Sequence, residues 1–335
     1  TIIEEKKRHI DTMQKIINNF IPENIILASD DDREGEAIAW HICELFSLNI
    51  QTTKRIIFHE ITKHAILEAV NSPVVINMNI VEAQLARQIL DIIVGYRVSP
   101  YLWKYLYNDK TNSLSAGRCQ TPALNLIYEN EQKQTDKLEQ KYKTTASFTH
   151  KEIEFSLSTD FTNTEEVEVF LKQSISFQHT LSIHDAKDTE KNSPVPFQTS
   201  KLLQAANNVL HYSPKQTMDI CQKLYQSGYI TYMRTESAKY SGAFINKATE
   251  YITSKYSDTF IGDLSKIKNT NSNNPHEAIR VTNLSVSSLS SENDKSLNAL
   301  YKLIWKNTLQ SCMASAKYKT YKLTITAPQT YKYTS

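Results

Sequence analysis

The chain has 335 residues, of which 40% are hydrophobic and 22% are charged, so it can bury a core in about two or three domains. Its net charge is only +2, which excludes a generally basic surface and leaves a local cluster of cations as the place where a polyanion could bind. Four cysteines, none in a C-x-x-C pair, argue against a zinc module and against a secreted disulfide scaffold. We therefore expect a reduced, intracellular protein.

No apolar run approaches the roughly 18 residues that a membrane span needs, and the charged start "TIIEEKKRH" lacks the apolar core of a signal peptide. We expect no membrane partner. Because the first residue is Thr rather than Met, we also expect the chain to be a piece of a longer protein.

Residues 1–75 alternate between helical and strand patterns. Helices are predicted at 4–20, 34–46 and 62–70, and strands at 24–29 and 55–58. This order favours a parallel sheet with crossover helices. A long helical stretch follows at 81–107, where we expect breaks near Gly95 and Pro100. A loop at 108–118 then leads into a helix at 121–132.

From 141 to 185 apolar and polar residues alternate, which predicts antiparallel strands. Residues 187–197 are predicted to be a linker, and two helices are predicted at 198–210 and 214–227. Gly228 is typical of a helix end, and residues 229–233 are predicted to form a short strand. Helix–turn–helix–strand is the outline of a winged-helix unit. A last strand is predicted at 318–328, with no partner evident.

The first candidate site is "LASDDDREGEAIAWH". In it Asp30, Asp32 and Glu34 occupy every second position, at the point where a predicted strand ends and a predicted helix begins. Ligands of α/β sheets bind at the carboxyl ends of strands. Three neighbouring carboxylates repel each other unless a cation is present, and oxygen ligands favour Mg²⁺. The alternative is a charged first turn that complements the helix dipole.

Two weaker candidates supply cations. In "SLSAGRCQTPA", a Ser-Ala-Gly turn allows a ligand to approach the backbone, and Arg118 could hold a phosphate. In "NPHEAIRVT", His276 could donate to a phosphate oxygen, with Glu277 beside it and Arg280 further along a helix turn. A surface loop and a structural histidine explain these segments about as well.

The fourth candidate is "QSGYITYMRTES". On strand periodicity Tyr229 lies on one face and Tyr232 on the other. A phenol with a pKa near 10 is a poor nucleophile at neutral pH unless a cation or base assists it. Arg234 is two residues from Tyr232 and could serve that purpose. The alternative is that both tyrosines are packing residues.

Together, "SDDDREGEAIAWH", "SAGRCQTPA", "GYITYMRTES" and "HEAIR" resemble, in this order, the signature segments of type IA DNA topoisomerases. The segments "RIIFHEIT" and "EAQLARQILDIIVGYRVSPYLW" between them also resemble that pattern. The resemblance covers nearly the whole chain, and the joint match is far more specific than any one motif.

The resemblance implies a multidomain fold of α/β plus mainly α class with a toroidal architecture. The implied domains are a Toprim α/β domain with a parallel sheet at 1–76, a helical DNA-binding domain at 77–135, an incomplete antiparallel β gate domain at 136–193 and 318–335, and a winged-helix-like domain carrying the tyrosine at 194–317. A first Toprim strand with its own catalytic glutamate is expected before residue 1, and any zinc-bearing tail after residue 335. The chain is thus expected to be a catalytic-core fragment.

The resemblance also implies roles for individual residues. Asp30, Asp32 and Glu34 match the D-x-D-x-E metal carboxylates, and Tyr232 falls on the nucleophile, which leaves Tyr229 as the packing ring. The implied catalytic residues are Tyr232, Arg234, Glu34 and His276. The implied DNA-binding residues are Arg87, Arg118, Arg234, His276 and Arg280.

The implied reaction is transesterification on single-stranded or negatively supercoiled DNA, through a 5′-phosphotyrosine, with Mg²⁺ and without ATP. We expect a monomer that is intracellular and DNA-associated, in the nucleoid of a bacterium or in the nucleus, virion or host factory of other sources. The chain departs from the family pattern at Glu236, where Asp is usual, and at Val281, where Pro is usual. "YITYM" leans toward the topoisomerase I branch and "CQTP" toward the topoisomerase III branch.

Two other classes of protein share part of this pattern. A Toprim-containing primase or nuclease would need the acidic cluster but not Tyr232. A winged-helix DNA-binding protein would explain residues 198–232 and would leave the acidic cluster without a role.

Overall fold

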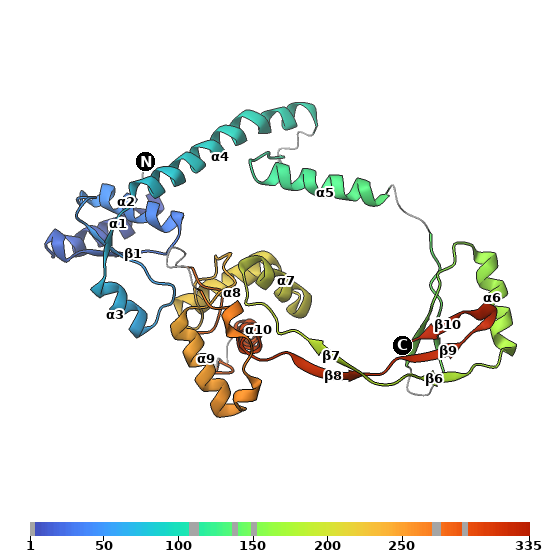
Figure 1. The fold of residues 1–335 in the computed structure, drawn as a ribbon. Coiled ribbons are helices and arrows are strands. Elements are labelled where there is room, and N and C mark those ends of the chain that lie inside the picture. The colour runs from blue at the N-terminus through green and yellow to red at the C-terminus, as the bar shows by residue number, and fades with distance from the viewer. Residues whose placement is uncertain (1–3, 107–113, 136–139, 149–152, 270–275, 290–293) are drawn as a thin grey trace. The chain divides into compact units, whose positions relative to one another are not determined.

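The computed structural model describes residues 4–106, 114–135, 140–148, 153–269, 276–289 and 294–335. The chain divides into two compact units (Figure 1), one made of Thr1–Ile93 with Asn192–Ser315 and the other of Val94–Lys191 with Ala316–Ser335. Within the described residues, no helix combines the length and the apolar character that crossing a membrane requires. The predicted loop at 108–118 lies partly outside the described residues.

The first unit begins with a small α/β layer. Its helices are α1 (Glu4–Ile17), α2 (Arg33–Phe46) and α3 (Lys63–Asn71), and its strands are β1 (Ile26–Ala28), β2 (Lys54–Ile56) and β3 (Val74–Val75). The strand order is β1-β2-β3, with β1 and β2 parallel and β3 antiparallel to β2. The predicted alternation is confirmed, as is the parallel pairing of its first two strands. Leu27, Cys43 and Phe46 are among the residues of the core beneath this sheet.

The remainder of the first unit is helical. It contains α7 (Thr199–Leu210), α8 (Pro214–Gln226), α9 (Gly242–Lys255) and α10 (Lys295–Cys312), as well as short 3-10 turns. The two helices predicted at 198–210 and 214–227 are therefore confirmed. Ser213 caps α8 by accepting a hydrogen bond from the Gln216 amide, and Pro214 occupies its first turn, where it loses no helical hydrogen bond. These helices enclose the largest hydrophobic core of the molecule.

The strand predicted at 229–233 does not form. Ile230 makes only an isolated β-bridge with Val281, and the four residues from Ile230 to Met233 are all buried. Because they thread through the helical core, both faces of the segment are covered and the alternation of a surface strand is lost. The helix turn expected around Arg280 is also wrong, since this segment is extended and bridges both Val281 to Ile230 and Ile279 to Phe197.

The long helix α4 (Met78–Tyr105) runs without interruption through Gly95 and Pro100, so the expected breaks are wrong. Pro100 lies near the end of the helix, where few turns follow it. The carbonyl that loses its helical donor belongs to Tyr96, which is 80% exposed, so water can satisfy it.

The second unit contains α5 (Gln120–Thr135) and a five-stranded antiparallel sheet in the order β4-β5-β10-β9-β6. The strands are β4 (Thr145–Ser147), β5 (Glu154–Leu157), β6 (Leu181–Ile183), β9 (Leu323–Thr326) and β10 (Lys332–Thr334). In Figure 1 the red strands β9 and β10 lie beside strands from the middle of the chain. The single strand predicted at 318–328 is in fact two strands, β8 (Ala316–Thr320) and β9, which belong to different sheets. Only β9 has partners on both sides.

Two elements of the second unit differ from the prediction. Residues 164–176 form a helix, α6 (Thr164–Ser176), which begins at the cap Asn163 and buries Phe170 against the sheet. The residues 187–191 of the predicted linker form β7 (Lys187–Lys191), which pairs with β8 (Ala316–Thr320). Every residue of β7 and β8 is exposed, so neither strand has the apolar alternation that would reveal it.

Gly228, just after α8, packs closely against the backbone of Ile61 in the α/β layer, and this contact can be tested. Its φ is +75°, and an added Cβ would lie 2.4 Å from the carbonyl oxygen of Ile61. We expect Gly228→Ala to lower the free energy of unfolding by at least about 1–2 kcal/mol, because the left-handed conformation is strained for an L-residue and the clash adds to it. The midpoint of urea unfolding, followed by circular dichroism, measures the change.

Gly95→Ala is the matched control. The nearest atom to its added Cβ is 3.9 Å away, and alanine is favoured over glycine in a helix by up to about 1 kcal/mol. This variant should be as stable as the parent or more so. Equal midpoints for both variants would contradict the close packing of Gly228 on Ile61.

Candidate active site

The site begins where β1 and β2 end. Because the two strands are parallel, their carboxyl ends lie at one edge of the sheet, with Asp30, Asp31 and Asp32 following β1 and His59 following β2. Asp32 caps α2, and its Oδ1 accepts a hydrogen bond from the Gly35 amide at 2.7 Å. The acidic run therefore lies at one edge of the sheet and at the positive end of a helix.

Tyr232 lies directly against this edge. Its backbone amide donates to the carbonyl oxygen of His59 at 2.8 Å, and its hydroxyl donates to Oδ2 of Asp32. The ring is only 4% exposed and packs edge-on against Tyr225, with 5.3 Å between ring centroids. An Nη1 atom of Arg234 lies 3.6 Å from the same Asp32 oxygen. The predicted nucleophile and its arginine thus both contact one predicted metal carboxylate, Asp32.

The surroundings keep this phenol protonated. Burial and the hydrogen bond to Asp32 raise the pKa of Tyr232 well above its usual range, and the charges of Asp32 and Asp30 add to that effect. Arg234 acts in the opposite direction but does not prevail. At neutral pH the site therefore holds a phenol whose proton points at a carboxylate.

Tyr229 is not the buried packing ring that was expected. It is 41% exposed and contacts Tyr301 edge-on, with 6.0 Å between ring centroids. The ring that is buried is Tyr232, because the segment passes through the core instead of lying on a sheet surface. The predicted nucleophile is therefore also a core residue.

The three predicted metal carboxylates do not converge as a set. Burial, and then the nearby charge of Asp32, raise the pKa of Asp30 above its usual value. Glu34 instead is 42% exposed, and its Oε1 lies 3.6 Å from Nη1 of Arg87. Within the described residues, the carboxylate oxygens of Asp30, Asp32 and Glu34 do not all lie within 4.8 Å of one another.

Two of the predicted DNA contacts have different surroundings. Arg280 is only 7% exposed in its side chain, and it pairs with Glu277 at 2.6 Å and with Glu60 at 3.0 Å. It also lies over the ring of Phe244. This arginine is held by two carboxylates in the folded chain, and its predicted contact with DNA stays a prediction. Arg118 is exposed in the second unit, just before α5.

Sequence reasoning missed Arg55, whose side chain binds two residues at or next to the acidic run, Asp30 and Glu36. This side chain is completely buried, and its guanidinium lies 2.9 Å from Glu36 and donates to the carbonyl oxygen of Asp30 at 2.8 Å. It also donates to the hydroxyl of Ser29. The available signal was a charged residue inside the apolar strand "RIIF", because a buried arginine requires partners.

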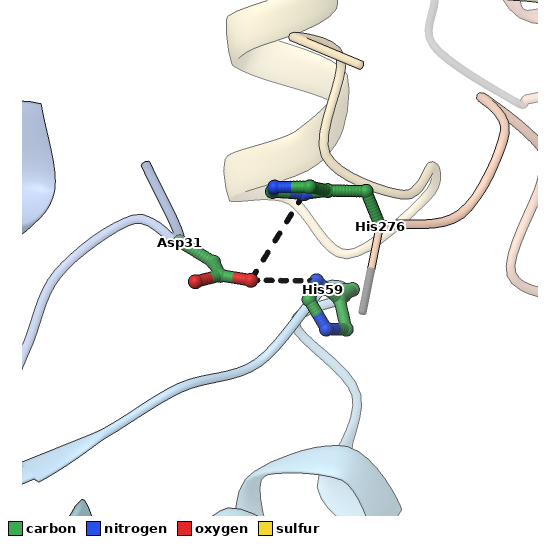
Figure 2. A group of neighbouring side chains, drawn as sticks. All are labelled: Asp31, His59 and His276. Carbon is green, nitrogen blue, oxygen red and sulfur yellow. Dashed lines mark ion pairs between the residues drawn. The ribbon is translucent and has the colours of Figure 1, made fainter. Parts of the chain in front are cut away.

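Asp31, His59 and His276 form a second cluster beside Tyr232 (Figure 2). Oδ2 of Asp31 lies 3.4 Å from Nδ1 of His59 and 4.0 Å from Nδ1 of His276. Burial lowers the pKa of His59 below its usual value, although the charge of Asp31 opposes this. Only His276 of these three residues was predicted, and it is 38% exposed in its side chain.

Comparison with known protein families gives the class of the protein. The family model described as DNA topoisomerase matches residues 75–335, and the model of the Toprim domain matches residues 1–61. The chain therefore belongs to the type IA DNA topoisomerase family. Its coarse fold class is that of a multidomain α/β protein.

Two similar relatives come from bacteria. The chain is 38% identical over 339 residues to DNA topoisomerase 1 of Buchnera aphidicola subsp. Schizaphis graminum (strain Sg), and 36% identical over 340 residues to that of Buchnera aphidicola subsp. Acyrthosiphon pisum (strain APS). Each match covers 97% of this chain and 39% of the relative. The chain thus spans about two fifths of the length of these curated relatives.

A solved structure agrees with this assignment. The chain superimposes on full-length topoisomerase I from Thermotoga maritima with a TM-score of 0.73 and 32% sequence identity. The match covers 100% of this chain and 56% of that structure.

The role of Arg55 is testable through its partner. Arg55→Met leaves the carboxylate of Glu36 buried without its cation, which we expect to cost about 3–5 kcal/mol of unfolding free energy. Adding Glu36→Gln should restore part of that loss, because the amide oxygen can still accept from the backbone of Asn77 as Glu36 does now. Urea unfolding of the two variants gives the comparison. A double variant no more stable than Arg55→Met would contradict the pairing.

Proposed function

We propose that this chain carries the cleavage and rejoining chemistry of a type IA DNA topoisomerase. The protein cleaves one strand of DNA through a 5′-phosphotyrosine, passes a strand through the break and reseals it, which relaxes negative supercoils without ATP. The observation that carries the proposal is the hydrogen bond from the Tyr232 hydroxyl to Asp32, with Arg234 beside it. It supports a phenol that has both a proton acceptor and a cation within reach.

In the cleavage step, the Tyr232 oxygen attacks the phosphorus of a phosphodiester. The bond between that oxygen and phosphorus forms, the bond from phosphorus to the 3′ oxygen breaks, and the leaving oxygen gains a proton from solvent. Oδ2 of Asp32 is oriented to accept the phenol proton, because it already accepts the hydrogen bond. In resealing, the 3′-hydroxyl gives its proton to solvent as its oxygen attacks the phosphotyrosine. The bond from phosphorus to the Tyr232 oxygen breaks, and Asp32 returns the proton to the departing phenol. One phosphodiester replaces another, so no external energy is needed.

The arginines supply positive charge around the phosphate. Arg234 is 56% exposed in its side chain, so it can turn from Asp32 toward a phosphate oxygen when DNA enters. Arg87 is 43% exposed and pairs only loosely with Glu34. We propose that these two side chains, together with His276 and with Arg118 of the second unit, contact the DNA backbone. Arg280 is left out of this set and is assigned a structural role.

The acidic edge fits a magnesium ion. Mg²⁺ is commonly held by one or two carboxylates and retains several waters, and the electrostatic conflict between Asp30 and Asp32 is what a divalent cation would relieve. We propose Asp30 and Asp32 as the principal ligands, with Glu34 nearby on α2. When bound, the ion would neutralise charge on the phosphate and on the 3′ oxygen, chiefly during resealing.

We also propose the domain arrangement of the family for this chain. Residues 1–76 would form the Toprim domain, 77–135 the helical domain, 136–193 with 318–335 the β gate, and 194–317 the winged-helix-like domain. Support comes from the Toprim match, from the antiparallel sheet of the second unit and from the helix pair before Tyr232. A toroidal arrangement of these domains rests on the family resemblance, as does a monomeric state.

The nucleophile is tested with the complete gene product and single-stranded DNA. A label at the 3′ end of the oligonucleotide should remain with the denatured protein, whereas a 5′-end label should not, because the tyrosine keeps the downstream strand. Tyr232→Phe should reduce this adduct by several orders of magnitude while DNA binding persists, since only the attacking oxygen is lost. Gel electrophoresis after denaturation measures the adduct.

Tyr229→Phe is the matched control, because it removes the neighbouring exposed phenol. It should retain the adduct. If Tyr232→Phe still forms the adduct, or if the 5′-end label is the one retained, the protein does not use this chemistry. Intact catalysis in Tyr232→Phe would instead favour a Toprim primase or nuclease.

The metal assignment predicts a separation of the two half-reactions. With chelator present, single-stranded DNA should still be cleaved, but resealing and supercoil relaxation should fail, so the covalent adduct should accumulate. Added Mg²⁺ should reverse the accumulation, and Asp30→Asn should show the same accumulation even with Mg²⁺ present. Relaxation assays on plasmid and adduct assays on oligonucleotide report the two steps. Full relaxation in chelator would contradict a role for Mg²⁺ in resealing.

A further inference from the structure

We propose that Asp31, His59 and His276 form a second metal site, which takes a divalent transition-metal ion such as Zn²⁺ or Co²⁺ in preference to Mg²⁺. This site is separate from the proposed magnesium carboxylates. It uses Asp31 between Asp30 and Asp32, and it adds two imidazoles that the magnesium site does not have. The binding of the ion does not depend on the proposed function.

The geometry of the cluster is close to that of a metal site. One ligand atom from each of the three residues lies within 4.8 Å of the others, and the Asp31 oxygen is 3.4 Å and 4.0 Å from the two Nδ1 atoms. Metal–ligand bonds of about 2.0–2.1 Å in a tetrahedral arrangement place ligand atoms roughly 3.3 Å apart. Small side-chain rotations would close the remaining distance.

Figure 2 shows the orientation that this requires. Both imidazoles direct a ring nitrogen toward the same oxygen of Asp31, and the three side chains come from three separate segments of the first unit. Asp31 follows β1, His59 follows β2, and His276 precedes the bridge at Ile279. Segments distant in sequence thus bring two histidines to one carboxylate, whereas the side chain of His64 on α3 is 87% exposed.

The Asp31 carboxylate also has an unsatisfied requirement. The Asp31 side chain is only 16% exposed, and its Oδ2 atom is buried and makes no hydrogen bond within the described residues. A buried carboxylate oxygen without a donor is costly, and the contacts to the two histidines are too long for good hydrogen bonds. A cation between the three atoms would satisfy this oxygen.

The ligand set decides which ion fits. Neutral imidazole is a common ligand of Zn²⁺, Co²⁺, Ni²⁺ and Cu²⁺, whereas Mg²⁺ prefers oxygen ligands. The negative charges of Asp30 and Asp32 on either side favour any cation here. A cavity lined by Asp31, Asp32, Glu36 and His276 adjoins the cluster and gives an ion and its water a route of entry. The fourth coordination position would be filled from this cavity.

Binding would tie together the strand ends and the segment before Ile279. Because the ion would bind the folded state and not the dispersed ligands of the unfolded chain, it should raise the unfolding temperature. It would also hold the imidazole of His276. The consequence of that for DNA cleavage rests on the proposed function, whereas the gain in stability does not.

Co²⁺ is the probe for this site, because its visible d–d absorption reports ligand type and coordination number. The complete gene product is freed of metal and titrated with Co²⁺ in the presence of excess Mg²⁺, which occupies the carboxylate site. All proteins carry Cys119→Ser, since Cys119 is an exposed thiol that would compete for the ion. We expect a visible band typical of nitrogen and oxygen ligands, distinct from the thiolate absorption of any zinc-bearing tail after residue 335. This band should saturate near one Co²⁺ per chain and be displaced by Zn²⁺, and the unfolding temperature should rise with Zn²⁺.

Two ligand variants and two controls locate the ion. His59→Asn and Asp31→Asn should each weaken Co²⁺ binding by at least about 10–100-fold, because losing a residue that merely hydrogen-bonds to a metal ligand already costs that much. Each variant should also abolish the thermal shift. His64→Asn removes an exposed histidine of α3 and should leave both signals intact. Glu34→Gln removes a predicted magnesium ligand and should also leave them intact.

Several outcomes would overturn the proposal. It fails if Co²⁺ produces no saturable band, if the band survives in His59→Asn and Asp31→Asn, or if Glu34→Gln removes it as effectively as they do. The last result would place the ion at the magnesium carboxylates. Because metal-free His59→Asn can be compared with metal-free parent by circular dichroism, loss of folding is distinguished from loss of the site.

Discussion

The contact between the Tyr232 segment and the acidic edge of the small sheet is the constraint on which the rest of the site depends. Tyr232 and Asp32 are 200 positions apart in the chain, yet the phenol donates to this carboxylate and the Tyr232 amide donates to the His59 carbonyl. Together the two bonds fix both ends of the tyrosine. They bring the proposed nucleophile from the helical part of the unit to the acidic edge of its α/β part.

Several neighbouring contacts hold this segment in place. The hydroxyl of Thr231 donates to the Ala278 carbonyl at 3.0 Å and accepts from the Arg280 amide at 2.9 Å. Arg280 in turn lies between Glu60, next to His59, and Glu277, next to His276. The arginine therefore connects the loop after β2 to the segment that carries His276. Burying it with two carboxylates makes the network costly to break, which suits a scaffold for catalytic groups.

If Tyr232 is the nucleophile, as we propose, the same geometry explains how its phenol is kept inactive. With its proton directed at Asp32 and its ring buried, Tyr232 stays neutral in the absence of substrate. A phosphate and a cation at the acidic edge would shift the balance of charge toward phenolate. In this account reactivity is gained only when the DNA backbone arrives, so the unligated site does not attack other electrophiles.

The sequence predicts the elements of this fold better than it predicts their environments. The alternation over the first 75 residues and the helices before Gly228 were predictable because each carries its own periodicity and capping residues, such as Ser213. The strand at 229–233 was predicted wrongly because a short apolar run reads the same whether it pairs with other strands or passes through a core. The exposed strands β7 and β8 carry no apolar signal at all.

The candidate site was predictable in part for a similar reason. Asp32, Tyr232 and Arg234 could be named because each lies within a recognisable motif, whereas Arg55 and His59 act through contacts that only the folded chain creates. Arg280 shows how an environment can differ from what a motif suggests. Its motif suggested a DNA contact, but two carboxylates from different segments enclose it in the fold. Partners distant in sequence decide such cases, and no local pattern records them.

Identification of the modified atom tests the central claim most directly. The covalent complex of the complete gene product with single-stranded DNA can be trapped by denaturation, digested with nuclease and protease, and sequenced by tandem mass spectrometry. The account predicts a nucleotide joined through its 5′ phosphate to the side chain of Tyr232. A nucleotide on Tyr225, on Tyr229 or on any other residue would contradict it.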